Sequence, residues 1–349
     1  MMDRDEALIE EAIRANFKDV GDKSKAEYQA DLFHYADYLH SVFKVGILKA
    51  EREHVRAFMN HLKDKGGQDP AASRIGCSWC KARGFPEGRK GKPLSPSRRK
   101  KYLSALRFVY HHTLEASGWP TVDPTNGLPA PTVDTKYGFV PERADMKKLL
   151  EANGDIRGKM LSYFLYYVPV RREEARNVKW SDIAELDSTR PLVEIHQVKG
   201  GGRATYWIAP ALRVMLREYR AWQLNEAKRN PRLADALAHD DSAFLFMSKT
   251  GKQLHASSLN KMINRRAVKA GIALEPCECQ DSVDGYCSKV TPHVFRRTWA
   301  NYAINDPKSP VTIDVVSKAL GHSDIGTTRR HYADTDDSRV MEALLDDRL

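Results

Sequence analysis

The sequence lacks any uninterrupted apolar run long enough to cross a lipid bilayer. Its first residues, Met1 to Glu6, also lack the basic segment followed by an apolar one that marks a secretory signal. Cysteine is scarce, with five in 349 residues, and there is no internal repeat or low-complexity tract. We therefore expect a globular protein of the reducing cytoplasm, whose cysteines are thiols or metal ligands rather than disulfides.

Acidic residues are almost absent from one segment, and that segment sets the charge of the whole chain. Between Arg74 and Arg107 there are eleven Lys or Arg and one acid, Glu87, a surplus of ten. The net charge of the chain is also +10, so the remainder is close to neutral. Positive charge concentrated in this way predicts contact with a polyanion, above all a nucleic acid. The tail from Asp336 to Leu349 is the opposite, with five acids against two arginines.

A chain of 349 residues suggests two domains, and the pattern of the first, residues 1–117, is typical of an all-helical domain. Ser24 begins a capping box ahead of a helix with one apolar face, and a second helix covers residues 51–63. Glycines and prolines make residues 66–94 an irregular insertion. Ser95 then caps a third helix that begins with proline. We expect DNA contacts from its outward basic residues: Arg98, Arg99, Lys101 and Arg107.

Prolines interrupt residues 118–141, which we interpret as an interdomain linker, and the second domain covers residues 142–335. Two β-rich runs, 192–197 and 204–208, flank Lys199 and three glycines, which predicts a hairpin with a glycine turn. Helices are expected at residues 142–152, 156–167, from 171, 210–227, 256–270 and around 293. The predicted fold is mainly α with a small β-sheet: an all-helical N-terminal domain followed by a mixed α+β domain.

Several residues of the second domain suit phosphate chemistry. Transfer of a phosphodiester needs a nucleophile that can hold the phosphate, cationic donors around its oxygens and an acid for the leaving group. His293 and Arg296 lie three apart on one helical face. Leu-Gly-His322 is typical of a helix end with glycine in the left-handed position, and Tyr332 follows ten residues later. The pattern is completed by residues upstream: Arg171, Glu174 and Lys199.

In order and spacing, these residues resemble the tyrosine recombinase family, also called the phage integrase family. The resemblance covers residues from about 140 to 335, and the helical domain resembles the family's core-binding domain. It implies a site-specific DNA recombinase, an enzyme that breaks and rejoins DNA strands in integration, excision or resolution. The short stretch before the first predicted helix favours a Cre- or Xer-like two-domain architecture. No metal or nucleotide cofactor is implied for the reaction, because the phosphotyrosine linkage retains the energy of the broken bond.

The resemblance also implies a role for each residue of the pattern. Tyr332 is the implied nucleophile, which forms a 3′-phosphotyrosine, and Lys199 the general acid for the 5′-hydroxyl leaving group. His293 is implied to assist deprotonation of the tyrosine, whereas Glu174 is expected to orient its helix or Arg171. The implied phosphate donors are Arg171, Arg296 and His322. Outside this pattern, Arg172 and either Arg329 or Arg330 are candidate contacts to the DNA backbone.

Two other functions share part of this pattern. A type IB-like topoisomerase resembles the family in its catalytic residues but relaxes supercoils as a monomer. A non-catalytic DNA-binding regulator would lack at least one catalytic group, and none is missing here. The tail, residues 336–349, carries an apolar stripe that includes Val340 and Leu344, which favours docking on a neighbouring subunit. We therefore expect a recombinase that acts on double-stranded DNA as a homotetramer on two recombination sites.

The cysteines form two groups with metal-ligand spacing. Cys77 and Cys80 are three apart in the insertion, while Cys277, Cys279 and Cys287 lie in one polar segment of the second domain. Three interpretations stand: a structural zinc ion in each group, one zinc site shared by both groups, or five reduced thiols. The family pattern requires neither group.

Overall fold

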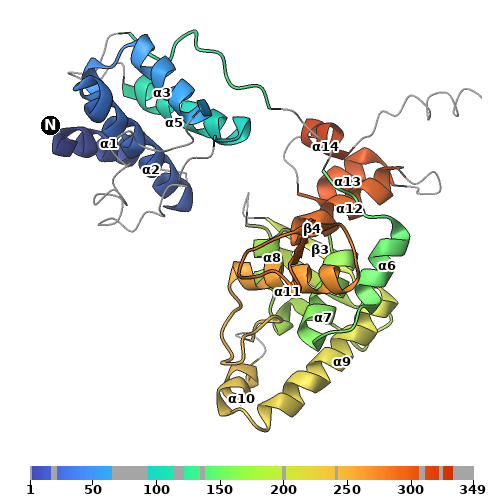
Figure 1. The fold of residues 1–349 in the computed structure, drawn as a ribbon. Helices are drawn as coiled ribbons and strands as arrows, with labels where there is room; N and C mark the ends of the chain where they lie inside the picture. Colours follow the sequence, from blue (N-terminus) through green and yellow to red (C-terminus); the bar gives the residue numbers. More distant parts are fainter. Residues whose placement is uncertain are drawn as a thin grey trace, which may run out of the picture. The chain divides into compact units, whose positions relative to one another are not determined.

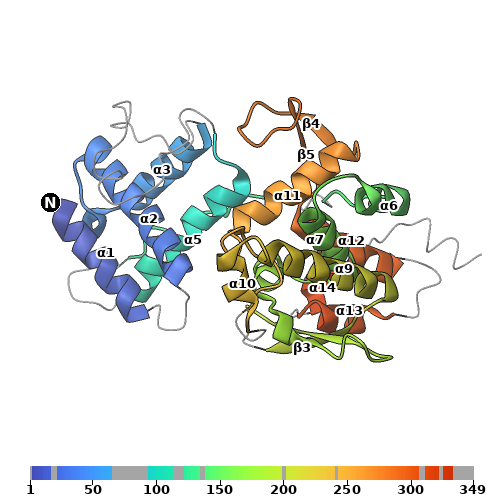
Figure 2. The ribbon, with the colours of Figure 1, turned by 90° about the horizontal axis from the view of Figure 1, so that it is seen from below.

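The computed structural model describes residues 2–16, 22–64, 93–113, 122–133, 138–198, 202–239, 243–305, 311–321 and 325–332. The chain forms two compact units, Met1–Asp134 and Thr135–Leu349, each with its own hydrophobic core (Figures 1 and 2). Within the described residues, no helix is both long and apolar enough to cross a membrane.

The first unit is helical, as predicted, and is built around buried aromatic side chains. Its elements are α1 (Met2–Asn16), α2 (Asp22–Tyr38), a π-helical turn (Leu39–Phe43), a 3₁₀ turn (Ile47–Lys49), α3 (Arg52–Asp64) and α5 (Pro96–Thr113). Tyr35 and Tyr110 are buried, and the Tyr110 hydroxyl donates to the Ile47 carbonyl at 2.9 Å. The polar end of a core aromatic residue thus holds the turn that joins α2 to α3.

The first helix, α1, has no counterpart in the sequence-based prediction. Its apolar face, which includes Ile9 and Ile13, is buried in the core of the unit. The buried carboxylate of Asp5 accepts hydrogen bonds from His40 Nε2 and from the N–H of Ile47, each at 2.9 Å. Because these partners lie more than thirty residues away, no local pattern predicts this acceptor.

The starts of two helices test the predicted caps. α2 begins at Asp22, so Ser24 lies inside the helix, and the predicted capping box was wrong. α5 begins at Pro96, and Ser95 Oγ accepts the N–H of Arg98 at 3.3 Å, which confirms that cap. Residues 65–92, which hold nearly all of the predicted insertion, lie outside the described residues.

The first part of the predicted linker packs against the helical unit. Leu128 is buried in that unit's core, and its carbonyl accepts a hydrogen bond from Arg107 Nη2. Arg52 Nε donates to the carbonyl of Asn126 at 3.0 Å. The division between the units falls at Asp134, well after residue 118, because Leu128 supplies apolar contact that the proline content did not reveal.

The second unit is α+β, and every helix that the sequence predicts for it is present, whereas the helices at residues 231–237 and 325–332 were not predicted. It comprises α6 (Arg143–Glu151), α7 (Ile156–Tyr167), α8 (Arg172–Asn177), a 3₁₀ turn (Trp180–Asp182), α9 (Pro210–Ala227), α10 (Pro231–Leu237), α11 (Ala256–Lys269), α12 (Pro292–Asn305), α13 (Ile313–Ala319) and α14 (Ile325–Tyr332). α7 lies against α9, α11 and α12 (Figures 1 and 2). Leu161 and Phe164 of α7 are fully buried, as expected of a helix covered by neighbours on several sides.

Three short strands form an antiparallel sheet in the order β1–β2–β3: β1 (Ile183–Ala184), β2 (Leu192–His196) and β3 (Arg203–Trp207). The register pairs Val193 with Tyr206 and His196 with Arg203, so the predicted hairpin is confirmed. Val193 and Ile195 lie on one face of β2 and are buried in the core. This face holds the hairpin firmly on the unit.

A second hairpin was not predicted. It consists of β4 (Leu274–Pro276) and β5 (Tyr286–Ser288), which pair antiparallel with Glu275 opposite Cys287. The hairpin joins α11 to α12, and β5 lies beside α11 (Figure 2). Three of the five cysteines lie in or between its strands.

Candidate active site

Arg171 is held at the start of α8 by the carboxylate of Glu174. One carboxylate oxygen accepts the backbone N–H of Arg171 at 2.6 Å, and the other accepts Arg171 Nη1 at 2.8 Å. Glu174 is buried, with 3% of its side chain exposed, whereas 25% of the Arg171 side chain is exposed. The i, i+3 spacing thus fixes the guanidinium while part of it still faces solvent. Arg171 Nη2 also donates to the carbonyl of Gly321 at 3.4 Å.

Arg296, on α12, also approaches the carboxylate of Glu174. Its side chain is only 3% exposed, and Nη1 lies 3.9 Å from the Glu174 carboxylate. Nη1 donates to the carbonyl of Pro169 at 2.7 Å, and Nη2 donates to the carbonyl of Leu320. Two guanidinium groups therefore share one buried carboxylate, which leaves a surplus of one positive charge beside the end of α13.

The end of α13 adopts the conformation that Leu-Gly-His predicts. Gly321 follows the C-cap residue Leu320 and has a φ of +58°, in the left-handed region. A Cβ at Gly321 would lie 2.5 Å from Gln197 Nε2 and would displace the end of that side chain, so glycine suits both this approach and the positive φ. Gln197 lies at the base of the β2–β3 hairpin, where its N–H donates to the Gly202 carbonyl at 2.8 Å. The hairpin and the end of α13 are therefore in contact.

Two predicted site residues adjoin this contact but lie outside the described residues. Lys199 is two positions after Gln197, and His322 is the residue after Gly321. The structure thus places Gly321, which precedes His322, beside the guanidinium of Arg171, and Gln197, which lies two positions before Lys199, beside Gly321. Gln197 was missed by sequence reasoning, since only the fold brings it to Gly321.

His293 lies on α12, the helix of Arg296, and Tyr332 lies on α14. His293 lies in the first turn of α12 and is exposed, while Arg296, three residues later, is buried. α14 packs on α12 and α13 and ends at Tyr332, whose side chain lies outside the described residues. Thr328 of α14 is fully buried, so this short helix is anchored in the unit.

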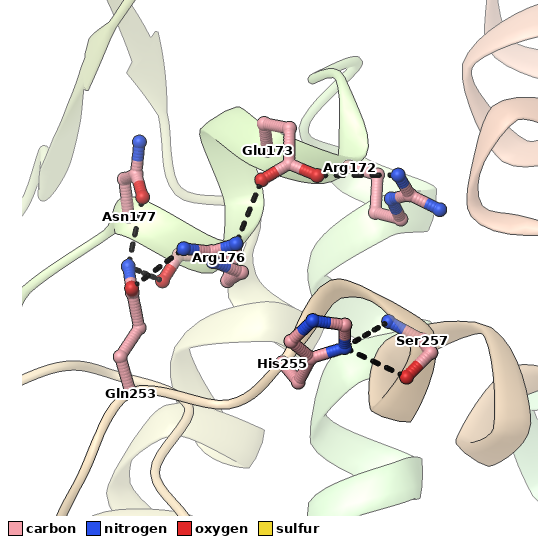
Figure 3. Close-up of polar contacts among 7 residues, drawn as sticks. All are labelled: Arg172, Glu173, Arg176, Asn177, Gln253, His255 and Ser257. Carbon is pink, nitrogen blue, oxygen red and sulfur yellow. Dashed lines mark hydrogen bonds and ion pairs between the residues drawn. The ribbon is translucent and has the colours of Figure 1, made fainter. Parts of the chain in front are cut away.

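The outer face of α8 is fixed by a polar network (Figure 3). Glu173 accepts hydrogen bonds from Arg172 at 3.2 Å and from Arg176 at 3.0 Å. Gln253 accepts from Arg176 at 2.8 Å and donates to Asn177 Oδ1 at 2.8 Å. The network ties α8 to the segment that leads to His255, whose Nδ1 caps α11 by accepting the N–H of Ser257. Because both faces of α8 are held, Arg171 has a defined position.

Another tyrosine, Tyr206 of β3, lies near the arginines, and its hydroxyl donates to the carbonyl of Ala319. Burial raises the pKa of Tyr206, and the positive charges of Arg296 and Arg171 only partly oppose this shift. Its hydroxyl therefore stays protonated at neutral pH and serves as a donor that holds α13 on the sheet.

Comparison with known proteins agrees with this arrangement. The sequence profile of the phage integrase family matches residues 142–339, which is more than half of the chain and contains every residue of the predicted catalytic set. The chain belongs to the phage integrase family. It is a tyrosine recombinase, an enzyme of DNA strand breakage and rejoining.

Relatives and solved structures cover the recombinase almost from end to end. It is 23% identical to the tyrosine recombinase XerD of Staphylococcus aureus over 334 residues, 93% of this chain and 92% of that protein. The structure of the Tn1549 transposon integrase in complex with circular intermediate DNA aligns with a TM-score of 0.62 at 16% identity, over 97% of this chain and 98% of that one. A lambda integrase tetramer bound to a Holliday junction aligns with a TM-score of 0.58 at 11% identity, over 95% of this chain and 76% of that one.

The basic helix α5 differs from its prediction. Arg98 and Arg99 are only partly exposed, and Arg98 Nη1 donates to the buried carboxylate of Asp31 at 2.7 Å. Burial raises the pKa of Asp31, and Arg98 opposes this shift. The expectation that Arg98 and Arg99 point largely outward was wrong, because intramolecular acceptors hold them: Asp31 for Arg98, and the carbonyl of Leu94, at 3.2 Å, for Arg99.

The remaining basic residues of α5 are exposed, although one has a partner. Lys100, Lys101 and Arg107 are exposed, and Arg107 Nη2 donates to the carbonyl of Leu128. The two lysines are therefore the better candidates for contact with DNA.

The three cysteines of the second unit lie together. The Sγ atoms of Cys277, Cys279 and Cys287 are all within 4.8 Å of one another. Hydrogen bonding within the group, chiefly with Cys277, lowers the pKa of Cys279 and raises that of Cys287 to about 12. Cys77 and Cys80 lie outside the described residues.

Proposed function

We propose that this recombinase cuts and rejoins DNA at specific sites through a 3′-phosphotyrosine at Tyr332. The observation that supports this best is the meeting of Arg171 and Arg296 around Glu174, beside Gly321. Two guanidinium groups against one carboxylate leave positive charge that a scissile phosphate can neutralise. Arginine suits this task because its planar fork donates to two oxygens at once and stays charged.

In the proposed reaction, the Tyr332 hydroxyl oxygen attacks the phosphorus and the bond to the 5′ oxygen breaks. The tyrosine proton leaves with assistance from His293, and Lys199 supplies a proton to the departing 5′ oxygen. Arg171, Arg296 and His322 donate to the non-bridging oxygens, where negative charge accumulates. Rejoining reverses these steps with a 5′-hydroxyl as the nucleophile, so no cofactor is consumed.

The same proposal gives each part of the chain a task in a Cre- or Xer-like architecture. The helical unit is the core-binding domain on double-stranded DNA, residues 142–335 form the catalytic domain, and residues 336–349 dock on a neighbouring subunit. Four subunits on two sites would exchange four strands in the cytoplasm. Full-length alignment with XerD supports this architecture, and the lambda integrase tetramer supports the assembly by analogy.

A suicide substrate that traps the covalent intermediate tests the reaction. Wild-type protein should form a covalent protein–DNA adduct, and Tyr332→Phe should form none while it binds DNA with nearly unchanged affinity. Tyr286→Phe, at an exposed tyrosine of β5, is the matched control and should form the adduct normally. An adduct with Tyr332→Phe would refute the assignment of the nucleophile.

Two further assays test specificity and assembly. A supercoiled plasmid without a target site should not be relaxed; rapid relaxation would favour the type IB-like topoisomerase. Truncation after Asp334 should spare binding to one half-site but abolish the four-subunit complex that light scattering detects on a full site. A truncated protein that still assembles and recombines at the normal rate would remove the docking role from residues 336–349.

A further inference from the structure

The β4–β5 hairpin brings three thiols together in the geometry of a metal site. Cys277 directly follows β4, Cys279 comes two residues later, and Cys287 lies within β5. Their Sγ atoms all lie within 4.8 Å of one another, and those of Cys279 and Cys287 are 3.5 Å apart. Zn²⁺ binds thiolates at about 2.3 Å in a tetrahedron, which puts ligand sulfurs about 3.8 Å apart. We infer that Cys277, Cys279 and Cys287 bind a structural zinc ion.

The backbone between the cysteines is folded specifically to bring them together. Val283 and Tyr286 exchange two N–H···O bonds, each of 2.9 Å. The residues between them, Asp284 and Gly285, have φ values of +51° and +80°. This is the Asp-Gly two-residue turn that suits a tight hairpin. The turn returns the chain so that Gly285 accepts the N–H of Cys277 at 2.8 Å, which places Cys287 opposite the other two thiols.

Side chains of α11 fasten this loop to the unit. Asn264 Oδ1 accepts the N–H of Ser288 at 2.7 Å, and Asn264 Nδ2 lies 3.9 Å from Cys287 Sγ. Lys261 forms an ion pair of 2.8 Å with Asp281, within the loop. The thiols therefore belong to a fixed structure and not to a chance approach of mobile side chains.

The hairpin needs a cross-link because it has no core of its own. None of residues 273–289 is buried, so apolar contact contributes little to holding the excursion in shape. A disulfide does not provide the cross-link, since the 3.5 Å separation far exceeds an S–S bond of about 2.05 Å, and three thiols leave one unpaired. A bound metal ion joins all three and links its binding energy to local folding.

Zinc is the metal that three thiolates in this hairpin favour. Soft sulfur ligands select zinc over magnesium, calcium or manganese. In the described part of the chain the cluster consists of these three side chains, so the fourth tetrahedral position is available to a water molecule or another ligand. The ion would fix the segment that leads through the buried Val290 into α12, the helix of His293 and Arg296.

Metal analysis of the purified full-length protein tests this inference independently of recombination. We expect about one zinc ion per chain by elemental analysis. Cobalt(II) added after chelation should give the thiolate charge-transfer absorption and the visible bands of a tetrahedral site. Absence of that cobalt spectrum in the wild-type protein would overturn the inference.

Two variants locate the site. Cys279→Ser, at an exposed position, should weaken zinc affinity at least tenfold and make the β4–β5 hairpin more sensitive to limited proteolysis. The matched control, Cys77→Ser with Cys80→Ser, should keep the zinc and the cobalt spectrum. Unchanged affinity in Cys279→Ser, or loss of zinc in the control, would show that these three cysteines do not form the site.

Discussion

The arginines of the helical unit and those of the catalytic unit have different balances of neighbouring charge. In the helical unit, Arg98 pairs with the buried carboxylate of Asp31, and its guanidinium lies 4.4 Å from the ring centre of Tyr102. In the catalytic unit, Arg171 and Arg296 share the single carboxylate of Glu174. One guanidinium is matched by one carboxylate in the first case, and two guanidiniums by one carboxylate in the second.

This difference shows why the number of basic residues is a poor guide to the DNA-binding groups. The sequence of α5 is rich in charge, but Arg98 is already neutralised within the protein. In the catalytic unit, the fold brings Arg171 and Arg296 together around Glu174, a single carboxylate that cannot balance both charges. A surplus of fixed cations in a largely buried place indicates an anionic partner, because an uncompensated buried charge is unfavourable.

The largest effect should come from a cation that takes part in the chemistry. Lys199→Ala should slow cleavage of ordinary DNA by about 10²- to 10⁴-fold, because a general acid is removed. DNA with sulfur in place of the bridging 5′ oxygen should restore the rate, since a thiolate leaves without a proton. Lys252→Ala, at an exposed lysine in a turn, is the control and should cleave both substrates normally. If sulfur gives no rescue, Lys199 is not the acid.

The carboxylate that the two arginines share should be the next most sensitive position. Glu174→Gln removes the negative charge of this side chain and can place the amide N–H₂ group against a guanidinium. The free energy of unfolding should therefore fall by about 3 kcal/mol, and cleavage should slow more than tenfold. Glu173→Gln alters the neighbouring network, where the side chain is 38% exposed, and should cost at most about 1 kcal/mol. Equal losses in chemical denaturation would contradict the special position of Glu174.

A smaller effect on stability should separate the arginine from the lysines of α5. Arg98→Ala leaves the carboxylate of Asp31 without its charged partner, so unfolding of the helical unit should become easier by about 2 kcal/mol. Lys100→Ala, at an exposed position, should change stability by less than about 0.5 kcal/mol. Thermal unfolding of both variants checks the difference. A neutral Arg98→Ala would mean that Arg98 is available to DNA after all.

The smallest effect should appear in the salt dependence of DNA binding. Lys100→Glu with Lys101→Glu should reduce the slope of log affinity against log salt by about 0.9 for each DNA phosphate that the variant no longer neutralises. Lys49→Glu with Lys63→Glu gives the same net charge at exposed lysines of the same unit and should leave the slope nearly unchanged. Equal reductions in both pairs would show that binding responds to net charge alone.

Local patterns explain which parts of this architecture could be predicted. Most helices of the second unit, the β2–β3 hairpin and the left-handed Gly321 follow from periodicity, turn residues and caps within a few positions, but α10 and α14 were not predicted. Long-range contacts could not be predicted in this way. Glu174 is three residues from Arg171, so their pairing was foreseeable, but its approach to Arg296 depends on how α8 and α12 pack.

The β4–β5 hairpin and α1 show the same limit. The Asp-Gly turn signal was present at Asp284, but the short exposed strands beside it carry no alternation of apolar residues. The buried Asp5 of α1 is satisfied by His40 and Ile47, and no spacing in the sequence connects them.

In the proposed reaction, Tyr332 holds the phosphate that is transferred at the arginine pair. Protease digestion of the trapped covalent complex, followed by mass spectrometry of the peptide that carries the nucleotide, tests this most directly. We predict that the modified residue is Tyr332, at the end of α14. We do not expect modification of Tyr206 beside the arginines, because its hydroxyl donates to the carbonyl of Ala319. Modification of Tyr206, or of any residue other than Tyr332, would show that Tyr332 is not the nucleophile.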